Sequence, residues 1–135
     1  MDDSLSIFSR IIRGELPGRF VWRDNDVVAF LTIAPIRPGH VLVVPLEQTD
    51  HWTDVTPAVW LRMAEVAQKI AKVLETLFEC DRVGVIVAGL EVPHCHIHLV
   101  PIRTEGDLSF ALADNNASPD ELDEAADRIR ASLNG

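Results

Sequence analysis

Apolar residues recur along this chain with two different periods, and each change of period marks an expected element. Between residues 57 and 77 they return at steps of three and four, which is the spacing of one face of an α-helix. Thr56 and Pro57 supply a start signal for that helix. The pattern predicts one long helix whose buried stripe is Val59, Met63, Val66, Ile70, Val73 and Leu77.

Two shorter helical patterns lie near the ends of the chain. Ser6 can cap a short helix that Gly14 and Pro17 would end. Ser118 and Glu121 have the spacing of a capping box, which predicts a C-terminal helix over about 118–134. The expected inward positions are Ile7, Phe8, Ile11 and Ile12 in the first helix and Leu122, Ala126, Ile129 and Leu133 in the second.

The remaining apolar segments are short and bounded by turn residues, as strands are. "RFVWRDNDVVAFLTI", residues 19–33, predicts two strands joined by a hairpin turn at 24–26. "HVLVVP" predicts a central third strand, "RVGVIVAG" a fourth and "HCHIHLVPI", residues 94–102, a fifth. Strands joined by hairpins, with helices set apart, indicate a single α+β domain over 1–135 built on a mainly antiparallel five-stranded sheet.

Composition narrows the class of partner. The 135 residues are 47% hydrophobic and carry a formal charge of -9, so neither nucleic acid nor an anionic membrane surface is expected as the main partner. The first residues lack a basic segment followed by an apolar one, and no apolar run approaches a membrane span, which predicts a cytoplasmic protein. The two cysteines are too few for a disulfide framework and are expected to be reduced.

Three of the five histidines stand at alternate positions in "EVPHCHIHLVPIR", residues 91–103. On a strand, side chains alternate between the two faces, so His94, His96 and His98 share one face. Cys95 and the alternate apolar residues share the other face, which belongs to the core. The histidine face is expected to meet solvent, a ligand or a cleft, because three imidazoles are poor core material without polar partners.

Three chemistries remain open at this point. The imidazoles could converge on a metal ion, although no fourth ligand is evident nearby. They could form a structural or pH-sensing cluster. They could also act as a nucleophile and acid/base groups on an anionic substrate, with one ring attacking and its neighbours holding negative charge.

The segment "HCHIHLV" resembles the histidine-triad signature of the HIT family. "IFSRIIRGELP", "VVAFLTIAPIRPGHVLVVP" and "AGLEVPH" resemble further blocks of that family in the same order, so the likeness spans about residues 6–103. The resemblance implies a HIT-like fold and a nucleotide hydrolase or nucleotidyl transferase. Its substrate class would be a nucleoside phosphoramidate, a dinucleoside polyphosphate or a related purine nucleotide conjugate.

The resemblance also implies roles for the three histidines. His96 would attack the α-phosphorus and form a nucleotidyl-histidine, which water then cleaves. The ring can attack through one nitrogen only if the other carries the proton, so a backbone carbonyl or His94 should hold that tautomer. His98 would contact the phosphate, and the scheme needs no metal or cofactor.

Motif alignment with the family further implies the walls of a nucleotide site. The nucleoside pocket would be formed by Ile7, Phe8, Ile11, Phe30 and Ile33, with Gly89 and Val92 beside the phosphate. Thr32 stands where the family commonly has a ribose-binding aspartate, and Leu90 and Glu91 replace a glutamine and a hydroxyl residue. These changes leave the substrate open and admit an alternative, a nucleotide-binding or sensor module with negligible turnover, which the Glu91 carboxylate favours.

The two remaining histidines are not expected to take part in the chemistry. His40 is expected to be structural and His51 to lie on the surface. Some relatives hold zinc with four ligands at positions that here are Ser6, Ser9, Gln48 and His94, so the resemblance predicts no structural zinc. By analogy with the family, we expect a homodimer.

Overall fold

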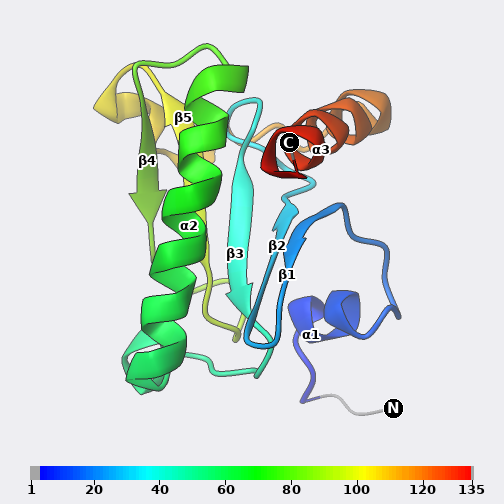
Figure 1. Cartoon of the computed structure of the whole chain (residues 1–135), viewed down its shortest axis with the longest axis vertical. Coiled ribbons are helices and arrows are strands. Elements are labelled where there is room, and N and C mark those ends of the chain that lie inside the picture. Colours follow the sequence, from blue (N-terminus) through cyan, green and yellow to red (C-terminus); the bar gives the residue numbers. More distant parts are fainter. Residues whose placement is uncertain (1–3, 135) are drawn as a thin grey trace.

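The computed structural model describes residues 4–134 and shows a five-stranded antiparallel sheet with helices on both faces (Figure 1). The strands lie in the order β1-β2-β3-β5-β4, so the third strand is central as predicted. The strands are β1 Phe20–Arg23, β2 Val27–Leu31, β3 Val41–Pro45, β4 Arg82–Ile86 and β5 Ile97–Ile102. The helices are α1 Ile7–Ile12, α2 Pro57–Leu77 and α3 Pro119–Asn134, with short 3-10 turns η1 Trp52–Asp54, η2 Glu105–Asp107 and η3 Phe110–Leu112.

The β1–β2 hairpin forms at the predicted turn because Asp24 satisfies its backbone donors. The N–H groups of Asp26 and Val27 both donate to Asp24 Oδ1 at 2.8 Å, and Trp22 Nε1 donates to Oδ2 at 2.9 Å. Residues of this kind favour turns because their side chains replace backbone partners. The turn sets the register in which Arg23 faces Val28.

The two faces of the sheet are covered differently. In Figure 1, α2 and α3 lie against one face, where Val27, Ala29, Val43 and Leu99 join the buried stripe of α2. The other face carries α1 over β2 and β3, and the segment 105–113 over β4 and β5. The histidines lie on this second face, because Phe30, Leu42 and His98 are aligned across three neighbouring strands.

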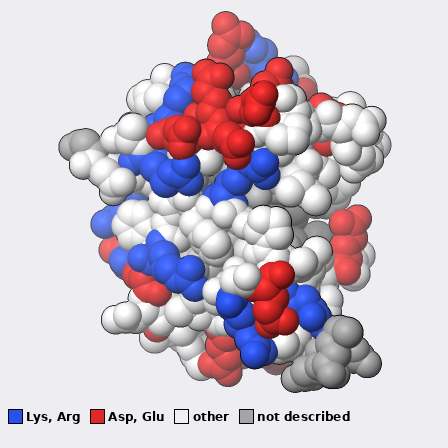
Figure 2. All heavy atoms as spheres, turned by 90° about the vertical axis from the view of Figure 1, so that its right-hand side faces the viewer, with Lys and Arg blue, Asp and Glu red and all other residues white. Residues whose placement is uncertain are grey.

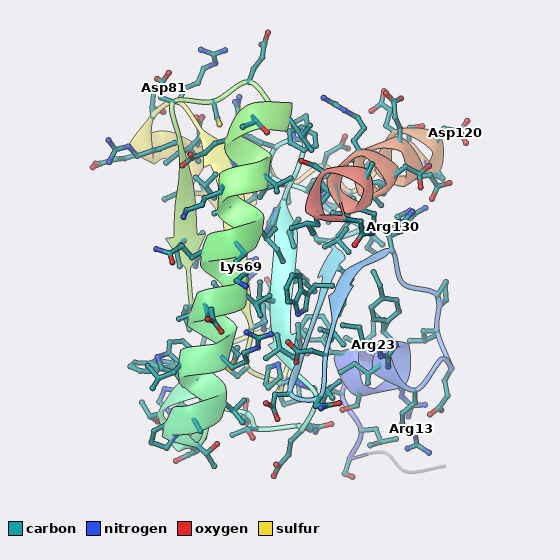
Figure 3. The ribbon with its side chains drawn as sticks, in the orientation of Figure 1. Arg13, Arg23, Lys69, Asp81, Asp120 and Arg130 are labelled. Carbon is teal, nitrogen blue, oxygen red and sulfur yellow. The ribbon has the colours of Figure 1, made fainter. Side chains whose placement is uncertain are left out.

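Two arginines attach helices to the edge strand β1. Arg130 Nη1 donates from α3 to the carbonyl of Phe20 at 2.8 Å, and Arg23 Nη2 donates from β1 to the carbonyl of Ile12 at 2.8 Å. Figure 3 shows Arg130 beneath α3 and Arg23 beside α1. These contacts hold α3 and α1 against β1.

Five of the 21 acidic residues lie on α3, on the face of the sheet opposite to the histidines. Figure 2 shows Asp and Glu side chains clustered at the upper end of the molecule, where α3 runs. Among residues 4–134, no helix has the length and apolarity needed to cross a membrane. The exposed acidic residues of α3 are Asp120, Glu121, Asp123, Glu124 and Asp127.

Candidate active site

Helix α1 forms one wall of a cavity of about 270 Å³ beside the histidines. Ser6 caps the helix by accepting from the N–H of Ser9 at 2.9 Å, as its sequence position predicts. Phe8 then packs edge-to-face on Phe30, with ring centroids 5.5 Å apart. The cavity is lined by Ile7, Phe8, Ile11, Leu16, Pro17, Gly18, Arg19, Phe30, Leu31, Thr32, Ile33 and Leu42.

Six of the predicted nucleotide-binding residues therefore line one cavity: Ile7, Phe8, Ile11, Phe30, Thr32 and Ile33. Sequence reasoning missed the walls formed by residues 16–19, by Leu31 and by Leu42. Leu42 could have been found, because it faces Phe30 across the β2–β3 ladder and therefore shares its face. Gly18 passes so close to Ile11 that a Cβ at Gly18 would lie 2.5 Å from the Ile11 side chain. The "LPG" turn was the only sequence signal for this close approach.

His94 does not meet solvent or a cleft, which corrects the expectation for the first histidine of the row. Its side chain is 0% exposed, and both ring nitrogens are used within the protein. Nε2 donates to the carbonyl of Pro45 at 2.7 Å, and Nδ1 accepts from Ser6 Oγ at 2.7 Å. Burial lowers the pKa of His94, although its bond to Pro45 acts in the opposite direction.

The contacts of His94 extend into a closed polar cluster of Ser6, Ser9, Gln48 and His94. Ser9 Oγ donates to Gln48 Oε1 at 2.8 Å, and the N–H of Ser6 donates to the same oxygen at 2.7 Å. Gln48 Nε2 in turn donates to the carbonyl of Ser4 at 2.7 Å. The four positions that the family resemblance aligned are thus adjacent in space and joined by hydrogen bonds. Within residues 4–134, no group of three or more His, Cys, Asp or Glu side chains could hold a metal ion.

His96 stands next in the row with its tautomer fixed by the backbone. Its Nδ1 lies 2.8 Å from the carbonyl oxygen of His94, and because a carbonyl can only accept, Nδ1 carries the proton. Nε2 then presents its lone pair, and no group within residues 4–134 is hydrogen-bonded to it. Burial lowers the pKa of His96, against the opposing effects of the bond to His94 and the charge of Glu91. The ring is therefore neutral at pH 7, as a nucleophilic imidazole must be.

His98 is held by His40, a residue for which the sequence predicted a structural role. The N–H of Ile36 donates to His40 Nδ1 at 3.0 Å, so His40 carries its proton on Nε2 and donates it to His98 Nδ1 at 2.9 Å. His98 consequently keeps its own proton on Nε2, which is free to donate to a ligand. Burial, followed by the repulsion that a protonated His96 would exert, lowers the pKa of His40 to about 4. Burial, followed by the repulsion that protonated His96 and His40 would exert, lowers the pKa of His98 to about 3.

A glycine turn holds His40 in this position. Gly39 has φ +89°, and a Cβ there would lie 2.8 Å from the ring of Phe78. Any other residue would be strained both by the backbone conformation and by this contact. His51, the remaining histidine, is exposed, as expected.

The strand that carries the triad is shorter than predicted. Strand β5 begins at Ile97, so His94 and His96 lie in the irregular segment before it. The alternation nevertheless holds, because Cys95 and Ile97 pack into the α2-side core. The backbone donors of this segment are satisfied outside the sheet, with Cys95 N–H donating to the carbonyl of Thr49 at 2.7 Å.

The loop before the triad lies outside the nucleoside cavity, and its predicted place beside the phosphate stays a prediction. Gly89, Glu91 and Val92 do not line the 270 Å³ cavity. Val92 packs against the Phe8 and Phe30 cluster, while the Glu91 side chain is exposed and acts on His96 through its charge. Gly89 has φ +79°, which makes a side chain unfavourable there.

A second cavity, of about 420 Å³, lies elsewhere, between the 35–40 loop, the end of α2 and the start of α3. Of the four buried histidines, only His40 lines it. We assign the chemistry to the smaller cavity because the row of imidazoles lies beside it.

Known proteins resemble this chain in sequence and in fold. The HIT domain model matches residues 13–105. The chain belongs to the HIT family. This HIT protein is 36% identical over 108 residues to an uncharacterised HIT-like protein of Methanocaldococcus jannaschii, covering 76% of this chain and 82% of that protein. It is 32% identical over 104 residues to the asymmetrical bis(5′-nucleosyl)-tetraphosphatase of Schizosaccharomyces pombe, covering 70% of this chain and 57% of that enzyme.

The fold likeness extends over nearly the whole chain. A zinc-bound histidine triad family protein from Mycobacterium smegmatis superposes with a TM-score of 0.80 and 30% identity, covering 95% of this HIT protein and 92% of that chain. The family membership and the α+β, HIT-like, five-stranded antiparallel fold expected from the sequence are therefore confirmed.

Proposed function

We propose that this HIT protein is a nucleotidyl hydrolase or transferase that acts through His96 on a purine nucleoside phosphoramidate, a dinucleoside polyphosphate or a related conjugate. The observation that carries the proposal is the bond from His96 Nδ1–H to the His94 carbonyl at 2.8 Å. It leaves a neutral imidazole with its Nε2 lone pair available beside an apolar cavity. The tetraphosphatase activity of the fission yeast relative supports a nucleotide hydrolase in general terms.

In the first step of this reaction, His96 Nε2 attacks the α-phosphorus and the bond from phosphorus to the leaving group breaks. The ring becomes cationic as the N–P bond forms, and its Nδ1–H bond to the His94 carbonyl strengthens because it is now charge-assisted. His98 Nε2–H donates to a phosphate oxygen and stabilises the charge that develops there. The leaving group departs with its electron pair and takes up a proton from the solvent, and the water that attacks in the second step returns one proton to the solvent.

In the second step, water attacks the same phosphorus and the N–P bond breaks. The products are a nucleoside monophosphate and His96 with its Nε2 lone pair restored. Another acceptor in place of water would make the reaction a transfer. The protein supplies position and charge stabilisation, which phosphoryl chemistry mainly requires.

The ligand that we propose for the cavity is the nucleoside part of the substrate. The cavity is walled by Phe8, Phe30 and aliphatic side chains, as suits a flat base. We propose that Thr32, which lines the cavity, contacts the ribose, although its Oγ1 already accepts from the N–H of Ala34 at 3.1 Å. We propose a homodimer on family analogy alone.

The test is incubation with a panel of adenosine and guanosine phosphoramidates, dinucleoside polyphosphates and nucleotidyl sulfates, with release of the mononucleotide followed by chromatography. We expect His96→Ala to lose at least about a thousandfold in kcat while nucleoside monophosphate binding stays measurable. His51→Ala, which changes an exposed histidine, is the matched control and should keep wild-type activity. A His96→Ala protein that kept more than about a tenth of wild-type activity would refute the nucleophile assignment.

The second candidate is a nucleotide-binding module without significant turnover. The exposed Glu91 carboxylate near His96 favours it, because a carboxylate repels an anionic phosphate. The same panel separates the candidates. Monophosphate binding by calorimetry without release from any substrate would establish the binding module.

We further propose that the protein holds no structural zinc. The Ser6, Ser9, Gln48 and His94 cluster satisfies its own polar groups and offers only one good zinc ligand, the His94 ring. Elemental analysis of protein purified without a metal-binding tag should give far less than one zinc per chain. Stoichiometric zinc in that sample would overturn the proposal.

A further inference from the structure

An exposed aromatic side chain, Phe110, touches the third histidine of the row. Its ring lies against His98 with centroids 5.0 Å apart and an interplanar angle of 64°. Although it is large and apolar, Phe110 is 43% exposed, whereas the neighbouring Leu108 and Ala113 pack into a buried cluster with Val100. The ring therefore contributes little to the core and much to the surface beside His98.

The segment that carries Phe110 is firmly held. Asp107 Oδ2 accepts from the N–H groups of Arg103 and Thr104 at 2.8 and 3.1 Å and closes the turn that leads into it. Leu108 packs directly on Gly84 of β4, where a Cβ would lie 2.9 Å from its methyl carbons. The far end is fixed by the N–H of Asp114, which donates to the carbonyl of Pro35 at 2.9 Å. Phe110 is thus presented on a fixed support.

Phe110 lies across the histidines from the nucleoside cavity. Five rings form a row, Phe30, Phe8, His96, His98 and Phe110, with successive centroids 5.5, 4.9, 4.7 and 5.0 Å apart. The first two line the cavity and the last does not. Figure 1 shows the same order, with α1 on the β1–β2 side of the sheet and the yellow segment that includes η2 and η3 on the β4–β5 side.

We infer that Phe110 is a specificity-determining residue that contacts the leaving group and favours one with a flat apolar part. The inference rests on the proposed function, in which the α-phosphorus lies at His96. A nucleoside in the cavity then directs the leaving group toward His98 and the exposed face of Phe110. An aromatic ring there gains from edge-to-face or offset contact with Phe110.

The negative charge near the triad also favours an uncharged leaving group. Glu91 is exposed and its carboxylate acts on His96 through space, so a polyphosphate leaving group meets repulsion there. An amine that carries an aromatic ring brings no negative charge. The leaving group that fits both features is an arylalkyl amine.

The test compares two adenosine 5′-phosphoramidates whose leaving groups are both primary alkyl amines, 2-phenylethylamine and ethylamine. Wild type should have a kcat/KM about fivefold to tenfold higher for the phenylethyl substrate, the size expected for one aromatic contact. Phe110→Ala should bring that ratio to about one and leave kcat/KM for the ethyl substrate within about threefold of wild type. Leu112→Ala, which removes another exposed side chain of η3, should keep the wild-type ratio.

Phe110→Leu guards against misfolding, because it keeps an apolar side chain and removes only the ring; it should lower the ratio while the thermal unfolding midpoint stays near wild type. A ratio of one in wild type, or one that survives in both Phe110 variants, would overturn this inference and leave the proposed function standing. An equal loss for both substrates would also overturn it, since that result shows a merely structural role. If wild type hydrolysed neither phosphoramidate nor any other substrate of the panel, the proposed function itself would fail and this inference with it.

Discussion

The two ends of the histidine row are built in opposite ways. At the first end, His94 is buried and both of its ring nitrogens are bound by Ser6 and Pro45. At the other end, His96 and His98 each have one nitrogen bound, by the His94 carbonyl and by His40, and each keeps Nε2 for a ligand. Histidines at alternate positions thus provide a structural anchor at one end and reactive groups at the other. The number of protein partners on each ring makes the difference.

The largest expected effect is a loss of folding stability at low pH, because the histidines at the ligand-binding end of the row are neutral in the folded protein. The folded pKa values of His40 and His98, about 4 and about 3, lie below the ordinary 6.5. Between pH 6.5 and 4 the unfolded chain therefore binds more protons, so stability is full above pH 6.5 and falls as the pH falls. From pH 6.5 to 5 each histidine costs about 1 to 2 kcal/mol, which makes about 3 kcal/mol for the pair.

Chemical denaturation at pH 7, 6 and 5 measures this loss. His98→Gln should flatten the slope by about 1 kcal/mol per pH unit, whereas His51→Gln, at an exposed position, should leave the slope unchanged. An identical slope in wild type and His98→Gln would show that other groups cause the acid sensitivity.

A smaller effect is expected at the closed end, where Ser6→Ala removes the hydroxyl that donates to His94. The change removes the shorter of two hydroxyl contacts to Nδ1 of a fully buried ring, leaving Ser9 Oγ at 3.3 Å, and should lower the free energy of unfolding by about 1 to 3 kcal/mol. Ser118→Ala is the matched control, because Ser118 also accepts from a helix N–H, that of Glu121, but contacts no histidine. It should cost about 1 kcal/mol or less. Equal losses for the two variants would mean that the Ser6 hydroxyl acts only as a helix cap.

The smallest effect concerns the ribose. Thr32 lines the cavity, and its hydroxyl is neutral, so it should bind a ribose oxygen less strongly than a carboxylate would by about 1 to 2 kcal/mol, or about tenfold in affinity. We expect weak monophosphate binding, little preference for ribose over 2′-deoxyribose, and selective tightening of the ribonucleotide in Thr32→Asp. The aspartate can still accept from Ala34 N–H, so the turn should persist. Calorimetric titration that showed more than about a hundredfold ribose preference in wild type would contradict the assignment of Thr32 to the sugar.

The sequence predicted those features that depend on neighbours along the chain. The stripe of α2, the Asp24 turn and the alternation through His94 to His98 each rest on spacings of a few residues, which steric and hydrogen-bonding rules govern directly. The resemblance to HIT-family motifs predicted most of the residues of α1 and β2 that line the cavity.

The features that the sequence did not reveal depend on contacts between distant segments. Ser6 and His94 are separated by 88 residues, and His40 and His98 by 58, so no local pattern marks either bond. His94 is buried because of such a contact, so the prediction that it meets solvent, a ligand or a cleft was wrong. The sequence analysis did not single out Phe110, because contacts of its segment with distant residues, such as the packing of Leu108 on Gly84, place it beside His98.

The proposed reaction requires a covalent bond between His96 Nε2 and the nucleotidyl phosphorus. This bond is detected by rapid mixing with an adenosine phosphoramidate, quenching under denaturing alkaline conditions that preserve N–P bonds, and intact-protein and peptide mass spectrometry. We expect a mass gain of one adenylyl group in wild type, located on His96 in the peptide that holds residues 91–103, and no gain in His96→Ala. Release of the mononucleotide by a wild-type protein that never carries the added mass, or an adenylyl group on His98 or His94, would contradict it.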